Sequence, residues 1–81
     1  MSEERLKFLG RRSELEMKKK SLELRIDGLV SGLRDELDPM KPRTDLRTDL
    51  IVTMGLDLAD AKDRLQEALA DLKKIQEILG R

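Results

Sequence analysis

The stretch IVTMGLDLADAKDRLQEALADLKKIQEIL, residues 51–79, repeats its apolar side chains every seven residues. One position of the repeat holds Ile51, Leu58, Leu65, Leu72 and Leu79, and a second position, three residues further on, holds Met54, Ala61, Ala68 and Ile75. Apolar residues spaced alternately three and four apart over several heptads are typical of a helix that packs along its length against another helix. We call these two positions the seam, and they predict an all-α fold.

The first part of the chain carries the same repeat. One seam position holds Phe8, Leu15, Leu22 and Leu29, and the other holds Arg5, Arg12 and Lys19 followed by Ile26 and Leu33. Because the repeat keeps its phase across Gly10, we expect one continuous helix over residues 2–38, capped by Ser2 and ended by Pro39. A restart at Ser13, which begins a capping-box spacing, is the alternative.

Residues 38–43, DPMKPR, form the only turn-rich segment, because two prolines three residues apart do not continue a helix. We expect a turn over residues 39–44 and a second helix over residues 45–79. Thr44 or Asp45 would cap this helix, and Leu46 and Leu50, four residues apart, would lie on one of its faces.

Two long helices joined by a short turn are antiparallel neighbours. The chain is therefore expected to fold as a single helical-hairpin domain, residues 1–81, in which facing residues have numbers that sum to about 83. This register places Leu15 near Ala68 and Phe8 near Ile75, so that large side chains face small ones at some layers and the helices approach closely.

The composition argues against catalysis. The chain has no histidine and no cysteine, and Phe8 is its only aromatic residue. No nucleophile–base pair or phosphate-binding loop is present, so we expect no enzyme activity and no cofactor. The acidic group Asp57, Asp60, Asp63 and Glu67 has no histidine or turn glycine in ligand spacing, which favours pairing with Lys62 and Arg64 over a metal site.

Charge and hydropathy predict a cytoplasmic protein. The 17 basic and 17 acidic residues cancel, so no strong overall field for nucleic acid is expected. The first five residues have no apolar signal core. The longest nearly apolar run, residues 50–56, is far shorter than the roughly 20 residues that span a bilayer, and we expect no membrane partner.

More apolar residues lie near the turn than one seam can cover. A self-association interface is therefore expected from Val30, Leu33, Leu37, Met40, Leu46, Leu50, Val52 and Leu56. Gly28, Gly32 and Gly55 fall in the same region and suggest a close approach of two backbones, the alternative being that the helices merely tolerate them. Two hairpins packed through their turn-proximal halves would form a homodimeric four-helix bundle, and a higher oligomer is the alternative.

These features predict a small protein–protein interaction or assembly module without chemistry of its own. One alternative is a nucleic-acid-binding regulator that contacts phosphates through Lys7, Arg11, Arg12, Lys18, Lys19 and Lys20. The other is a chaperone-like or inhibitor-like hairpin that binds another protein through its turn-proximal apolar residues. For the basic residues, a solvated helix face with pairs such as Glu14 with Lys18 and Glu16 with Lys20 is the simpler interpretation.

Overall fold

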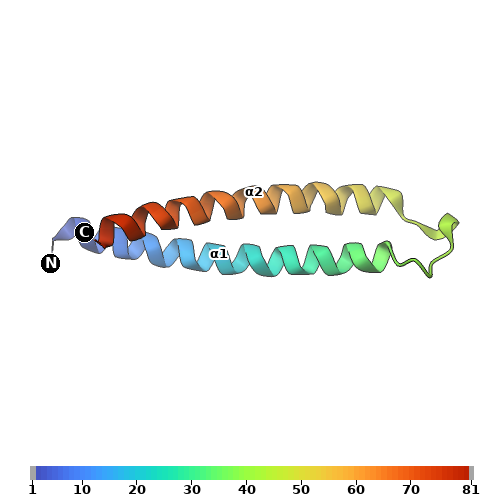
Figure 1. Ribbon diagram of the computed structural model, residues 1–81, viewed down its shortest axis with the longest axis horizontal. Coiled ribbons are helices and arrows are strands. Elements are labelled where there is room, and N and C mark those ends of the chain that lie inside the picture. The colour runs from blue at the N-terminus through green and yellow to red at the C-terminus, as the bar shows by residue number, and fades with distance from the viewer. Residues whose placement is uncertain (1, 81) are drawn as a thin grey trace.

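The protein is a helical hairpin shaped as a rod of 62 × 15 × 14 Å (Figure 1). This computed structural model describes residues 2–80, and Met1 and Arg81, which belong to the predicted domain, lie outside the described residues. Helix α1 spans Glu3–Glu36, a short 3-10 helix η1 spans Arg43–Asp45, and helix α2 spans Thr48–Leu79, with no strand among residues 2–80. The predicted all-α hairpin is confirmed.

Helix α1 is continuous through Gly10, as the unbroken repeat predicts. It begins where expected, because Ser2 Oγ accepts a hydrogen bond from the Arg5 amide at 3.3 Å and Glu3 and Glu4 occupy the first turn, where the helix dipole favours acids. It ends at Glu36, two residues before the predicted end, and the Leu37 amide still donates to the Leu33 carbonyl at 2.9 Å.

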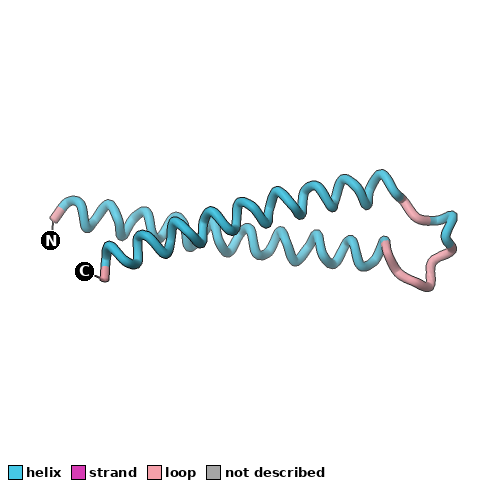
Figure 2. The backbone as a smooth tube through the Cα atoms, turned by 45° about the horizontal axis from the view of Figure 1, so that its top comes forward, coloured by secondary structure: helices cyan, strands magenta, loops and turns pink. Residues whose placement is uncertain are grey.

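The connection between the helices is longer than predicted (Figure 2). Thr44 and Asp45 do not cap α2; they lie in η1, and the residue before the helix is Arg47, whose side chain makes no capping bond. The predicted common helix face of Leu46 and Leu50 is also wrong, because the Leu46 backbone is extended. The non-helical residues Leu46 and Arg47 carry the chain across to the axis of α2, and a helix beginning at residue 45 would be too compact to span this distance.

The core of the hairpin is the predicted seam. Every buried apolar side chain among residues 2–80 occupies a seam position: Leu15, Leu22, Ala61, Ala68, Leu72 and Ile75. Leu15, Ala68, Leu72 and Ile75 form one cluster against which Phe8 and Leu79 pack, so the predicted register is confirmed. Leu15 and Ala68 are each 2% exposed, which shows how well a large residue facing a small one fills this narrow interface.

Burial differs between the two halves of the rod. The cluster of four buried residues lies toward the open end, where both chain ends are found. In the turn-proximal half the seam is only half-buried, at Leu29, Leu33, Ile51, Met54 and Leu58. The half of the hairpin that is richer in apolar residues is therefore the half that covers its seam less completely.

Of the three glycines near the turn, only Gly32 lies against the other helix. A Cβ at Gly32 would meet Met54 Sδ at 3.1 Å, whereas nothing stands within 4 Å of a Cβ at Gly28 or Gly55. The neighbour of Gly32 is thus the Met54 side chain and not the backbone of α2, so the close approach of two backbones expected at these glycines is not found, and within one hairpin Gly28 and Gly55 face open space.

Candidate interaction surfaces

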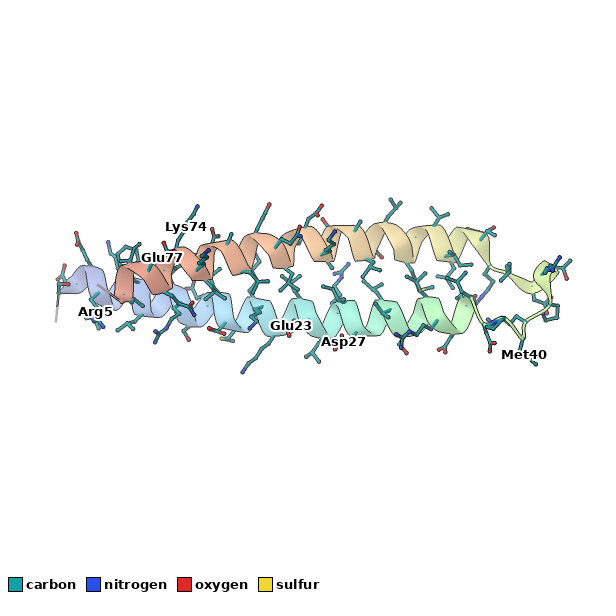
Figure 3. All side chains as sticks on the ribbon, viewed as in Figure 1. Arg5, Glu23, Asp27, Met40, Lys74 and Glu77 are labelled. Atoms are coloured by element: carbon teal, nitrogen blue, oxygen red, sulfur yellow. The ribbon has the colours of Figure 1, made fainter. Side chains whose placement is uncertain are left out.

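Large apolar side chains are exposed around the turn. Met40, at the tip, is 87% exposed (Figure 3), Leu56 is 67% exposed, Val52 61% and Leu37 54%. Leu46 and Leu50 are about one-third exposed, and Val30 and Leu33 are half-buried. All eight predicted interface residues therefore lie in or beside the turn-proximal half, but they do not form one continuous face.

The heptad position of each of these residues indicates the side of the rod on which it lies. In an antiparallel pair of helices, residues that come directly after a seam residue in the chain lie along one side of the rod, on both helices. Residues that come directly before a seam residue lie along the other side. Val30 and Leu37 of α1 and Val52 and Gly55 of α2 fall on the same flank, which we call the apolar flank. Leu33 belongs to the seam, Leu50 to the opposite flank and Leu56 to the outer side of α2.

A charged cluster that the sequence reasoning missed closes the turn end of the seam. Glu36 is buried, with 4% of its surface exposed, and its carboxylate accepts hydrogen bonds from Arg47 Nε at 3.0 Å and from Arg47 Nη2. Lys41 Nζ lies 3.6 Å from Glu36 Oε2. The bidentate hydrogen bonds from Arg47 and the nearby lysine charge together offset the free energy that the Glu36 carboxylate loses when it is removed from water.

The electrostatics of this cluster favour the ionised pair. Hydrogen bonding from Arg47 lowers the pKa of Glu36 below the ordinary range, against the opposing effect of burial. The same bond raises the pKa of Arg47. Glu36 therefore remains a carboxylate wherever the hairpin is folded at neutral pH, and its two cations tie α1 to the connection and to the start of α2.

The repeat itself contained the signal for this pair. Seven residues after Leu29 the seam of α1 reaches Glu36, and seven residues before Met54 the seam of α2 reaches Arg47. Extending both repeats by one heptad gives a facing pair whose numbers fit the same register as Leu15 and Ala68. Both residues lie within the predicted helices, but a charged residue near a helix end is usually solvated, so the repeat alone does not indicate a buried pair.

The basic residues of α1 do not form one patch. Lys7, Arg11 and Lys18 lie along the flank opposite the apolar flank, Lys20 lies on the apolar-flank side, and Arg12 and Lys19 are half-buried at the seam. Long basic side chains at seam positions cover neighbouring leucines with their aliphatic stems while the charge stays in water.

Ion pairs also occupy part of the charged surface. Among residues 2–80, those on the helix surfaces are Arg11 with Glu14 at 3.4 Å, Lys19 with Glu23 at 3.9 Å and Arg64 with Asp60 at 3.1 Å, instead of the expected pairs of Glu14 and Glu16 with lysines. The acidic group on α2 thus contributes Asp60 to a pair with Arg64, one of the two cations expected there.

At the open end, Arg5 joins the two helices. Its Nη1 donates a hydrogen bond to the Leu79 carbonyl oxygen at 3.3 Å, at a point where the carbonyls of the last turn of α2 lack helical partners. Both ends of the rod are therefore closed by an arginine that bridges the two sides of the hairpin.

Neither α1 nor α2 contains, within residues 2–80, an apolar segment long enough to cross a membrane. Comparison of the chain with protein-family models, with curated proteins and with solved structures found no match.

Proposed function

We propose that the protein is a small, non-catalytic interaction or assembly module of the cytoplasm that works as a self-associated helical hairpin. The observation that carries this proposal is the mismatch between apolar content and burial in the turn-proximal half. There the seam is only half-buried, while Leu37, Val52 and Leu56 are each more than half exposed. A rod with so few buried side chains gains stability when a second subunit covers this surface.

Self-packing is the natural way to cover these residues. Removing a leucine or valine side chain fully from water contributes about 1.5–3 kcal/mol, and a two-fold interface counts each residue twice, once on each subunit. The net charge of zero leaves no overall repulsion between two copies. The apolar flank contains residues of both helices, so a partner that packs on it contacts α1 and α2 at the same time.

The test is the solution mass, measured by light scattering on a sizing column over a range of chain concentrations. We expect a mass of two chains for the wild type. The double variant Leu37→Ser/Val52→Ser removes two apolar side chains from the apolar flank and should shift the mass toward one chain without loss of helix content.

Leu24→Ser is the matched control, because Leu24 is 73% exposed but lies on the outer side of α1, away from the apolar flank. It should leave the mass unchanged. A wild-type mass of one chain at every concentration up to about 100 μM would overturn self-association, because it would place the dissociation constant of the dimer well above that concentration.

A further inference from the structure

The neutral chain is divided into two oppositely charged halves. Leu22 and Ala61, both buried and facing in the register, mark the middle of the rod. Residues 22–61, which form the turn half, hold five basic and nine acidic residues, whereas the remainder of the chain, the open half, holds twelve basic and eight acidic residues. The rod therefore has an acidic turn half and a basic open half.

This division distinguishes between arrangements of two hairpins. Packing through the two turn halves alone, or packing in parallel over the whole length, brings halves of like charge together within a Debye length of about 8 Å. Antiparallel packing over the whole length instead places each acidic half on a basic half, which is the complementary arrangement.

Exposed apolar side chains on the side of the rod that carries the apolar flank also lie at nearly equal distances on either side of the middle of the rod. On α1, Leu37 follows Leu22 by 15 residues, and the exposed Leu6 precedes it by 16, on the same flank. On α2, Leu69 follows Ala61 by 8 residues and Val52 precedes it by 9. A two-fold axis at the middle would bring Leu37 to Leu6 and Leu69 to Val52.

The charges beside the axis also match. Lys20 and Glu23 lie within two residues of Leu22, and Asp27 lies one turn beyond Glu23 (Figure 3). In the antiparallel arrangement, α1 runs along the α1 of the other copy, so that Lys20 of each chain meets Glu23 of the partner subunit. The same axis places Asp27 beside Glu16 of the partner subunit, so the charge match on this flank is confined to Lys20 and Glu23 beside the axis.

We infer that the occupant of the apolar flank is a second copy of this chain, antiparallel and overlapping along the whole rod, with the turn of each copy on the open end of the other. This inference rests on the proposed self-association and specifies its geometry. It differs from packing through the turn-proximal halves in that the leucines of the open end, Leu6 and Leu69, become part of the interface.

Distances between labels in the homodimer test the geometry. The chain has no cysteine, so Thr44→Cys in the turn and Glu77→Cys near the open end can each carry a single spin label. With a rise of about 1.5 Å per residue and the axis at Leu22, both label-to-label distances should be similar, at about 50 Å.

Other arrangements give different distances. Parallel packing would make both distances short, and packing through the turn halves would make the Thr44 distance much shorter than the Glu77 distance. Either result, in a protein of two-chain mass, overturns the antiparallel inference and leaves self-association standing. A one-chain mass overturns both.

A charge swap tests the contact beside the axis. Lys20→Glu should weaken the dimer about tenfold, because it places an acid on Glu23 of the partner subunit, and Lys20→Glu/Glu23→Lys should restore it. Lys18→Glu makes the same change of charge on the opposite flank and is the control, with an effect below about threefold. Equal weakening by Lys18→Glu and Lys20→Glu, or no restoration by the swap, would contradict the inference.

Discussion

Glu36 stands at the position where the seam of α1 would otherwise place a further apolar residue after Leu29. A buried carboxylate is stable only when its partners replace the water it has lost, and Arg47 and Lys41 do so here. Glu36 and Arg47, which end the two seams, pair with each other, and this pairing fixes the position of the corner of the hairpin in the chain.

This cluster makes the stability of the hairpin depend on pH. The pKa of Glu36 is lowered in the folded state, so its contribution is fully present above the unfolded glutamate pKa of about 4.3 and is lost as the pH falls through the lower folded value. We expect Glu36→Gln to lower the melting temperature at pH 7, and the gap between the variant and wild type to close below about pH 4.

Circular dichroism melts at a fixed chain concentration between pH 7 and pH 2 measure this gap. Glu14→Gln is the control, because Glu14 pairs with Arg11 on the exposed surface, where such pairs contribute little. A gap for Glu36→Gln that stays the same across the whole pH range would contradict the assignment.

The two glycines Gly28 and Gly32 give a second prediction at this scale. Gly28→Ala should stabilise the hairpin by about 1 kcal/mol, since alanine favours the helix and nothing stands within 4 Å of the added Cβ. Gly32→Ala should gain less, because Met54 Sδ, at 3.1 Å, has to move. Urea unfolding of both variants measures the difference, and an equal gain would show that Met54 does not restrict this position.

At the scale of elements, the two helices and their seam can be predicted from the sequence, because a helix that buries one side places apolar residues at a regular seven-residue spacing. The start of α2 does not follow in this way. Thr44 and Asp45 are good cap residues by type, but the connection has to bring Arg47 to Glu36 across the space between two helices. That requirement depends on the distance between elements, which no local pattern contains.

The candidate surface is predictable only in part. The exposure of Leu37, Met40, Val52 and Leu56 follows from counting more apolar residues than a two-helix seam can hold. Their division among the flanks also follows from the heptad positions once the helices are antiparallel. The heptad positions do not extend through the connection, where Leu37, Met40 and Leu46 lie outside both α-helices, so the arrangement of these three side chains could not be predicted.

The packed cluster at the open half gives the prediction at this scale. Leu15 is 2% exposed and faces Ala68, so Leu15→Ala should destabilise the hairpin by about 2–5 kcal/mol, which is a large part of the stability of so small a domain. Leu24→Ala removes the same atoms from an exposed site and should change stability by less than about 0.5 kcal/mol. Similar losses for both variants in urea unfolding would mean that the seam is not the core.

At the scale of the whole molecule, a rod held by one seam is stabilised unevenly along its length. Its longest dimension is 62 Å and its others are 15 and 14 Å, so no side chain lies far from solvent and each layer depends on its immediate neighbours. Nearly all the well-buried layers lie between Leu22 and the open end. The packing that stabilises the hairpin is therefore concentrated at the open end of the rod, where no loop connects the two helices.

The position of this cluster sets the order in which backbone amides exchange with deuterium. Although the turn joins the two helices covalently, the amides of α1 and α2 nearest the turn should exchange first, and those around Leu15 and Ala68 last. Mass spectrometry of peptides from the deuterated protein would show this gradient, and uniform protection along both helices would contradict it. A hairpin with this gradient opens from its closed end, so that local unfolding begins where the chain is tethered and the free ends stay together longest.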